Sequence, residues 1–404
     1  MTCCAALAAL LAWLDTRGRL ASTLIVLFGI ASLVLIAVGL SLRETDAGSV
    51  ALVALPTPTP IPPAPTPTVI PTPAPILDGG EFIIEAASEA GAFERPTSFT
   101  FGDDGSLYVG FEAGIRIVRD LNSDGFFEDV NHFGHDAGWV FGLDFYEGSL
   151  YAAIDGTVQR FTDEDGDGVA DEQTTLLSGL PQQHYGGHSN SGLIVTPEGL
   201  IYMTVGGTSD HGPELEPFGG TILTMPLEGG PAVIHATGFR NPYDIAFCPD
   251  GRLYASDNGP DQIDDDTVET TPDEVNLVLE GRDYGYPDYF GVQDPSTGTE
   301  SPIALLPLAA GATGIICHDG TGLPESYAGN LFVTMWGTFA APVETGRRVM
   351  RVQLSESEDG TISGETTEFA DGFGHPIDIL QEEDGSILVL DFEHGQIFRI
   401  RYVR

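Results

Sequence analysis

The stretch Asp103–Gly110, DDGSLYVG, decides the fold because the chain repeats it. Five further segments combine a glycine turn with a following apolar or aromatic run: YEGSLYAA, PEGLIYMT, PDGRLYAS, AGNLFVTM and EDGSILVL. The equivalent positions are Tyr108, Tyr151, Tyr202, Tyr254, Phe332 and Leu388, which are 43, 51, 52, 78 and 56 residues apart. Repeats at this spacing indicate a propeller or another repeat array.

Each copy lies between two further apolar runs. PTSFTF (96–101) and PIDILQ (376–381) precede a turn, whereas TVQRFT (157–162) and QIFRIR (396–401) follow one. Alternation with period 2 between Gly or Asp turns is typical of antiparallel strands. Four strands per repeat form one blade, so we predict an all-β fold with a six-bladed β-propeller over residues 80–404.

The last repeat ends after its third strand. The segment EFIIEAAS (Glu81–Ser88) is predicted to supply the missing outer strand, so that the ring closes by pairing the two ends of the domain. A lectin-like sandwich is the competing all-β architecture, but it does not explain the repeated turn.

The charge balance excludes several classes of function. The chain has 60 acidic and 16 basic residues, a net charge of −44, and every basic residue is arginine. Without lysine there is no Schiff-base chemistry and no phosphate-loop lysine, and a chain this acidic is not expected to bind nucleic acid. An acidic surface attracts divalent cations instead.

The N-terminal segment is predicted to anchor the protein in a membrane. Residues 20–42 carry no charge and lie between Arg19 and Arg43, and 23 helical residues are long enough to span a bilayer. This length favours an uncleaved anchor over a signal peptide. Arg17 and Arg19 place the tail, residues 1–19, in the cytoplasm, and the rest outside the cytoplasm, at the cell surface or in the periplasm.

The linker, residues 43–79, is rich in proline and threonine. Pro56–Pro75 contains ten prolines, which predicts either an extended polyproline stalk or an unstructured spacer. Cys3 and Cys4 in the tail are either lipid attachment sites or small apolar residues.

Strand direction predicts where a ligand binds. In every blade the start of the first strand and the end of the second strand lie on the same rim. Long connections follow the second strand at 206–219, 257–273 and 337–346, as expected of a ligand-binding rim. The polar residues that open the first strands there are His188, Arg240, Asn241 and His375.

Three consecutive segments carry a family resemblance. HSNSGLIVTPEGLIYMTVGG begins at His188, GFRNPYDIAFCPDGRLYASDNGP at Gly238, and DEVNLVLEGRDYGYP at Asp273. Together they resemble the glucose/sorbosone dehydrogenase family of six-bladed quinoproteins. The resemblance implies pyrroloquinoline quinone and Ca²⁺ as cofactors, a sugar or polyol as substrate, and an external electron acceptor.

The resemblance also implies roles for individual residues. His188 matches the general base, and imidazole suits this role because its ordinary pKa lies near neutrality. Arg240 and Asn241 match the pair that contacts the quinone, and the carbonyls of Gly259 and Pro260 match calcium ligands. Without the resemblance, His188 is interpreted as a hydrogen-bonding residue on the rim. Arg240 and Asn241 then connect adjacent blades, and Gly259 and Pro260 form a turn. The residues that match a neighbouring calcium-binding stretch are Asp273, Glu274 and Tyr284.

The chain departs from the family pattern at four points. Gly206 and Gly207 occupy the position of the family's acidic residue that supports the catalytic histidine, and Gly192 replaces an arginine. His375 replaces a second arginine at the start of the last blade, and no lysine is present to contact the quinone. The candidate replacements are Asp210 or His211 for the acid, and Arg347 or Arg348 for the missing cation.

Two acidic segments predict metal binding without the family. DLNSDGFFED (120–129) and DEDGDGVADE (163–172) alternate oxygen-bearing side chains around a glycine, as calcium loops do. They are placed between third and fourth strands, on the face opposite the rim, with a structural role; an acidic solvated turn is the alternative. The ligand candidates are Asp120, Asn122, Asp124, Glu128, Asp163, Asp165, Asp167 and Asp171.

Cys248 and Cys317 precede the turns of adjacent blades and are either a disulfide or two buried thiols. His184, His211 and His318 are expected to be solvated loop residues.

The function predicted from these features is quinone-dependent sugar oxidation. The alternative is a non-catalytic calcium-binding propeller that binds carbohydrate or a protein partner at the cell surface. A calcium-dependent lactonase would need a carboxylate cluster at the channel.

Overall fold

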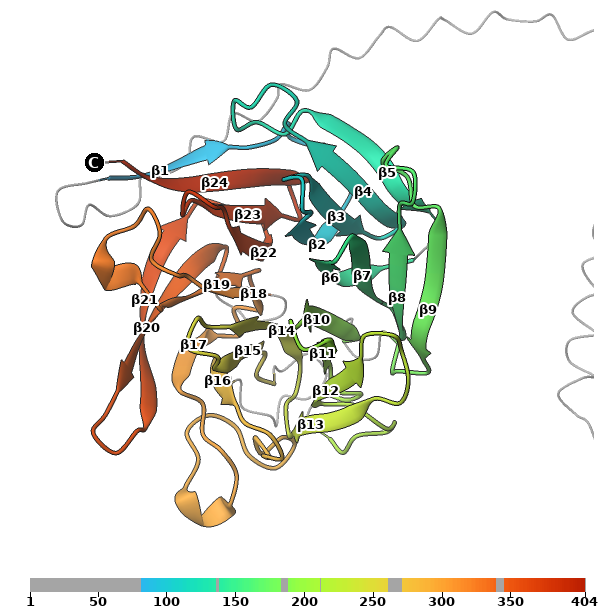
Figure 1. The fold of residues 1–404 in the computed structure, drawn as a ribbon. Coiled ribbons are helices and arrows are strands. Elements are labelled where there is room, and N and C mark those ends of the chain that lie inside the picture. Colours follow the sequence, from blue (N-terminus) through green and yellow to red (C-terminus); the bar gives the residue numbers. More distant parts are fainter. Residues whose placement is uncertain are drawn as a thin grey trace, which may run out of the picture. The chain divides into compact units, whose positions relative to one another are not determined.

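The computed structural model describes residues 81–135, 138–182, 188–210, 212–260, 271–338 and 345–403. They form six antiparallel sheets of four strands each. The sheets are arranged in a ring around a central axis (Figure 1). The prediction of a six-bladed propeller is therefore confirmed.

The first three blades follow each other along the chain, each with its strands in sequence order from the axis outward. Blade 1 is β2 (Pro96–Phe101), β3 (Leu107–Phe111), β4 (Gly114–Arg119) and β5 (Asp129–His135). Blade 2 is β6 (Val140–Tyr146), β7 (Ser149–Ile154), β8 (Thr157–Thr162) and β9 (Glu172–Ser178). Blade 3 is β10 (Asn190–Val195), β11 (Leu200–Val205), β12 (Thr221–Pro226) and β13 (Val233–Thr237).

The other three blades complete the ring, and two short 3₁₀ turns lie in their loops, η2 (Pro295–Thr297) and η3 (Glu325–Tyr327). Blade 4 is β14 (Pro242–Phe247), β15 (Leu253–Asp257), β16 (Pro272–Val278) and β17 (Ala304–Leu308). Blade 5 is β18 (Ala312–Cys317), β19 (Leu331–Met335), β20 (Arg348–Glu356) and β21 (Ile362–Asp371). Blade 6 is β22 (Pro376–Gln381), β23 (Ile387–Asp391), β24 (Gln396–Val403) and β1 (Glu81–Ala86).

The repeated turn has a conformational reason. Its glycine adopts a positive φ in every copy, for example 82° at Gly105 and 87° at Gly385. Glycine enters this left-handed region without steric cost, whereas other residues rarely do. The apolar residues that follow, such as Leu107, Leu150 and Leu331, are fully buried between neighbouring blades. The same short repeated segment thus provides both the turn and the core residues that follow it.

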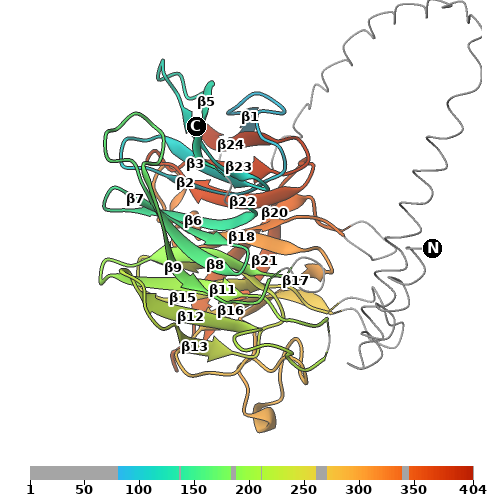
Figure 2. The same cartoon turned by 90° about the vertical axis from the view of Figure 1, so that its right-hand side faces the viewer.

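The ring closes as the sequence predicts. β1 pairs antiparallel with β24, in a register running from Glu81 opposite Val403 to Ala86 opposite Phe398. Figure 2 shows these two strands side by side near the C-terminus. Blade 6 thus combines both ends of the propeller, and no unpaired gap is left between the first and last blades.

The predicted tail, anchor and linker, residues 1–79, lie outside the described residues and stay predictions. Among the residues that the structure describes, no helix has the length and apolar character to cross a membrane.

Candidate active site

His188 precedes β10 and is held by the backbone of the loop after β11. The imidazole is buried, and Nδ1 lies 2.9 Å from the carbonyl oxygen of Gly207. A carbonyl oxygen only accepts, so Nδ1 carries the hydrogen and the basic lone pair of the neutral ring is on Nε2. A backbone carbonyl therefore orients the imidazole at a position where the family commonly places an acid.

Arg240 precedes β14 and is joined to the same loop. Its carbonyl oxygen accepts a bond of 2.6 Å from the N–H of Gly207. Its guanidinium is 5% exposed and forms an ion pair through Nη2 with Oδ1 of Asp210, which is also 5% exposed. Nε donates to the carbonyl of Asp210 at 3.0 Å. Asp210 thus neutralises the arginine. His211, the other candidate to replace the missing acid, lies outside the described residues.

Asp257, at the end of β15, organises the start of β14. Its carboxylate accepts the backbone N–H of Asn241 at 2.7 Å and that of Arg240 at 3.2 Å. The amide of Asn241 donates to Oδ1 of Asn258 at 2.8 Å, and Asn258 donates to the carbonyl of Ala312 in blade 5 at 2.7 Å. Burial, together with the charge of Glu274, raises the pKa of Asp257 well above its usual range.

Sequence reasoning missed Asp257 as a site residue. Its signal was present, since it stands directly before the NGP motif at the end of a buried strand.

Gly259 and Pro260 follow on the same rim. The N–H of Gly259 donates to Oδ1 of Asp273 at 3.1 Å, and the other oxygen of Asp273 accepts the N–H of Ala312 at 2.9 Å. The carbonyl of Pro260 accepts from Thr271 N at 3.3 Å. A Cβ added to Gly259 would collide with Oγ1 of Thr271, a buried atom that has no hydrogen-bond partner among the described residues. Glycine is therefore required for this close approach, and burial raises the pKa of Asp273 to about 6.

Glu274 and Asn276 form a second buried polar group on β16. One oxygen of Glu274 accepts the N–H of Gly291 at 2.6 Å, and the other accepts from the amide of Asn276 at 3.3 Å. Burial raises the pKa of Glu274 to about 7. Oδ1 of Asn276 is buried and has no hydrogen-bond partner in the part of the chain that the structure describes. The hydroxyl of Tyr284 donates elsewhere, to the carbonyl of Leu277 at 2.5 Å.

Arg347 and His375 meet on the rim between blades 5 and 6. Nδ1 of His375 donates to the carbonyl of Trp336 at 2.7 Å, and the two rings stack with centroids 3.8 Å apart. Nη1 of Arg347 lies 3.3 Å from Glu393, and Nη2 lies 3.5 Å from Nε2 of His375. A guanidinium and an imidazole are thus adjacent on the rim.

Arg348 has a different environment. Its Nε donates to the carbonyl of Gly346 at 2.8 Å, and its Nη1 forms an ion pair with Glu368 on the outer strand β21. Of the two candidate cations, only Arg347 contacts His375 among the described residues.

The two acidic loops join the third and fourth strands of blades 1 and 2. In the first loop, Asp120 accepts the N–H of Gly125 at 2.7 Å, and Asn122 accepts that of Asp124 at 2.9 Å while donating to Glu128 at 3.3 Å. The side-chain oxygens therefore turn into the loop.

The second loop is more tightly gathered. Asp163 accepts the N–H groups of Gly166 and Gly168, both at 2.8 Å, and Asp167 accepts that of Val169 at 2.9 Å. Carboxylate oxygens of Asp163, Asp165 and Asp171 lie within 4.8 Å of one another. Both loops lie on the face opposite His188, as the strand directions predict.

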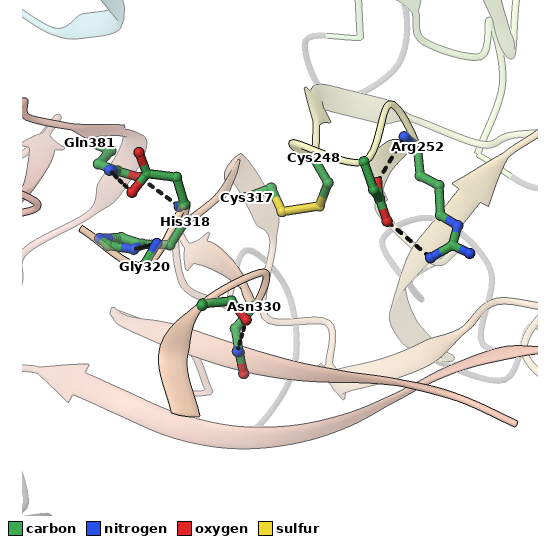
Figure 3. Close-up of a disulfide and its surroundings, with 10 residues drawn as sticks. Cys248, Arg252, Cys317, His318, Gly320, Asn330 and Gln381 are labelled. Atoms are coloured by element: carbon green, nitrogen blue, oxygen red, sulfur yellow. Dashed lines mark hydrogen bonds and ion pairs between the residues drawn. A yellow bond between two sulfur atoms is a disulfide. The ribbon is translucent and has the colours of Figure 1, made fainter. Parts of the chain in front are cut away.

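Cys248 and Cys317 form a disulfide between blades 4 and 5, which decides between the two alternatives (Figure 3). The expectation for His318 is wrong. The imidazole is fully buried, donates through Nε2 to the carbonyl of Gly385 at 2.9 Å and accepts from Gly320 N at 3.0 Å. It is enclosed because the turn of blade 6 packs over it, a contact that local sequence does not reveal.

Comparison with known proteins agrees with this geometry. The family model described as Glucose / Sorbosone dehydrogenase matches residues 139–399. Quinoprotein glucose dehydrogenase B of Acinetobacter calcoaceticus is 26% identical over 171 residues, which cover 34% of this chain and 34% of that protein.

Two solved structures share the fold. One, from Thermus thermophilus, is named as a putative oxidoreductase (glucose dehydrogenase) and has a TM-score of 0.62 at 23% identity, covering 79% of this chain and 99% of that one. The PQQ-bound form of aldose sugar dehydrogenase from Streptomyces coelicolor has a TM-score of 0.62 at 18% identity, covering 80% and 98%.

Proposed function

The chain belongs to the glucose/sorbosone dehydrogenase family, and from this premise we propose that it is a quinone-dependent oxidoreductase of an aldose or a related sugar or polyol. One observation carries the proposal. A continuous series of hydrogen bonds links His188 through Gly207 to Arg240, and Asp257 and Asn258 extend it toward Gly259. Imidazole, guanidinium and backbone oxygen atoms therefore gather on one rim.

The residues of this rim fit pyrroloquinoline quinone and calcium. Calcium prefers hard oxygen ligands, which Gly259 and Pro260 offer as carbonyls. The buried, unpartnered Oγ1 of Thr271 beside Gly259 also favours an ion or a water there. Arg240 and Asn241 offer donors to quinone oxygens, and the guanidinium of Arg347, which contacts His375, offers a cation where lysine is missing. The unpartnered Oδ1 of Asn276 beside Glu274 supports a second calcium position.

The proposed mechanism divides the oxidation between protein and cofactor. When bound, the quinone with its calcium ion supplies the two-electron acceptor. His188 receives the hydroxyl proton of the sugar on Nε2, because its Nδ1 hydrogen is engaged with Gly207. Asp257 fixes the backbone from which Arg240 and Asn241 project, so these side chains are positioned before the substrate arrives. Regeneration of the quinone would require an external electron acceptor.

Calcium is also proposed for the two loops of blades 1 and 2, in a structural role. The convergence of Asp163, Asp165 and Asp171 supports this for the second loop, and the inward-turned oxygens of Asp120 and Asn122 support it for the first. Calorimetric titration with Ca²⁺ before and after Asp163→Ala tests this, and an unchanged number of sites would reject the second loop.

We further propose that residues 20–42 tether the propeller outside the cytoplasm. A disulfide between Cys248 and Cys317 supports an oxidising compartment, because cytosolic thiols are normally kept reduced.

The second candidate function is a non-catalytic calcium-binding propeller that binds carbohydrate or a protein partner. The ion pair between Arg240 and Asp210 favours it, since the guanidinium already has a carboxylate partner inside the protein. A lactonase is not favoured, because the carboxylates on the rim and at the axis are engaged with backbone N–H groups. These are Asp257, Asp273, Asp144, Asp244 and Asp378.

The deciding experiment measures quinone binding and sugar oxidation separately. Full-length protein is mixed with pyrroloquinoline quinone and Ca²⁺, and bound-quinone absorbance and dye reduction with a panel of aldoses are recorded. His188→Gln is expected to retain the quinone but to lower dye reduction by about 10²- to 10⁴-fold. His132→Gln, an exposed histidine on β5, serves as the matched control and should be unaffected. Absence of quinone binding by the parent protein would favour the binding module.

A further inference from the structure

The axis of the propeller contains a cavity of about 350 Å³ that is separate from the residues assigned above. The innermost strands of all six blades line it. Three of the described lining residues are acidic and none is Lys, Arg or His. The acids are Asp144 on β6, Asp244 on β14 and Asp378 on β22.

Each of these carboxylates joins its own blade to the next one. Asp144 accepts the N–H of Val195 at 2.7 Å, which links blade 2 to blade 3. Asp244 accepts the N–H of Ile315 at 3.0 Å, which links blade 4 to blade 5. Asp378 accepts the N–H of Phe99 at 2.9 Å and so links the innermost strand of blade 6 to that of blade 1.

The intervening junctions use threonine hydroxyls. Thr97 donates to the carbonyl of Val140, Thr204 to that of Tyr243 and Thr313 to that of Pro376. Carboxylates therefore join every second junction, and neutral hydroxyls join the junctions between them. The junction of blades 4 and 5 has in addition the hydroxyl of Ser256 on the carbonyl of Thr313 and the disulfide between Cys248 and Cys317. Only the carboxylate clamps change charge with pH.

Asp244 and Asp378 lie against neighbouring residues of β18. Asp244 bonds to the N–H of Ile315, and a Cβ added to the preceding Gly314 would lie 2.7 Å from Oδ1 of Asp378. Asp244 also packs on Gly192, where an added Cβ would lie 2.5 Å from its Oδ1. Two carboxylates are thus brought together in a cavity with no cation among its described lining residues.

We propose that Asp244 and Asp378 hold one proton between them at neutral pH, and that losing it as the pH rises loosens the junctions of blades 4–5 and 6–1. The other titratable groups facing the pair are Tyr243, beside Asp244, and Asp144 across the cavity. The described lining residues of β2, β10 and β18 are uncharged. No counter-charge is available there when both acids ionise, so they repel each other.

The direction of the pH effect follows from linkage. Burial, with the charge of Asp378, raises the pKa of Asp244 well above its ordinary value, and burial raises that of Asp378 to about 7. In the unfolded chain both groups titrate near pH 4, at about their ordinary pKa. The folded protein therefore binds more protons in between, so its stability is full below about pH 4 and is lost as the pH rises through about 7.

The test compares urea unfolding of the full-length protein and its variants from about pH 5 to about pH 8.5. Asp378→Asn and Asp244→Asn each keep an oxygen that accepts the N–H but remove one charge. We expect the folding equilibrium constant of the parent to fall about tenfold per pH unit for each proton lost, and the slope to flatten in both variants. Asp144→Asn is the matched control, because burial raises its pKa only to about 6, and it should keep the slope above that pH.

An infrared measurement on the parent protein tests the proposal even if the variants do not fold. The infrared spectrum of the parent at pH 7 should contain the carbonyl stretch of protonated carboxyl groups, to which Asp257 and Glu274 also contribute. The part of this band that is lost in Asp378→Asn or Asp244→Asn belongs to the pair and should disappear at higher pH. Equal slopes in the parent and both variants, or no such band in the parent, would overturn the proposal. Neither readout involves the quinone or a sugar, so the outcome is independent of the proposed catalytic function.

Discussion

Asp210 forms a buried ion pair on the rim. It provides a buried carboxylate to Arg240, and neither side chain has an exposed charge. Breaking a buried ion pair leaves the remaining charge desolvated, which costs about 3–5 kcal/mol. We therefore expect Asp210→Asn to lower the free energy of unfolding by this amount, as measured by urea denaturation.

The same variant distinguishes a structural arginine from a ligand-binding one. An anionic quinone can return the lost charge, so it should raise the unfolding midpoint more in Asp210→Asn than in the parent protein. Glu112→Gln is the control, because it breaks the exposed pair with Arg95 and should cost about 1 kcal/mol or less. Equal losses in the two variants would contradict the buried pair.

Single residues show what sequence can and cannot predict. The repeat pattern predicted that His188, Arg240 and Gly259 lie on one rim, because strand direction determines which strand ends share a face. It did not reveal that Asp210 pairs with Arg240, since that depends on how the loop after β11 folds back. Gly192 is explained only by packing, because a larger residue would collide with Asp244.

At the level of elements, the repeated turn predicted the inner strands well and the outer strands poorly. Inner and second strands such as β2 and β3 are buried along most of their length, so their apolar runs stand out. The fourth strands face solvent, and β13 exposes Val233 and Ile234. Alternation is weak in β13, whereas β1, which is also a fourth strand, alternates clearly and was predicted.

The disulfide is a cross-link between two such inner strands. Cys248 follows β14 and Cys317 ends β18, and their Cα atoms are 5.0 Å apart. Spacing along the chain does not predict this proximity; only the packing of blade 4 beside blade 5 does. The bridge closes a loop with a sequence separation of 69 residues, for which chain entropy predicts about 4 kcal/mol of stabilisation.

We expect Cys317→Ala to lower the free energy of unfolding by about 4 kcal/mol in urea denaturation. Reductant should destabilise the parent protein by a similar amount and leave Cys317→Ala unchanged, which separates the bridge from other effects of the reagent. A variant as stable as the parent would show that the neighbouring blade contacts already hold these strand ends.

At the scale of the whole molecule, the propeller depends on one short N-terminal strand. The sequence predicted that Glu81–Ser88 completes the last blade, and β1 does so by pairing with β24 over its full length. This prediction succeeded because a ring leaves one geometric position open for the missing strand. The alternating carboxylate and hydroxyl clamps around the axis were not predictable, since they join residues up to 279 positions apart.

The closing strand is secured by Phe82, which is 1% exposed and packs in an aromatic cluster. Its ring lies 4.9 Å from that of Phe369 in blade 5 and 5.2 Å from that of Tyr402 on β24. Removing the ring leaves a cavity across the junction, so Phe82→Ala should lower the free energy of unfolding by about 3–5 kcal/mol. Leu121→Ala, at a side chain that is 66% exposed, should change it by about 0.5 kcal/mol or less. If both variants unfold at the same urea concentration, the stability of the propeller does not depend on the packing of Phe82.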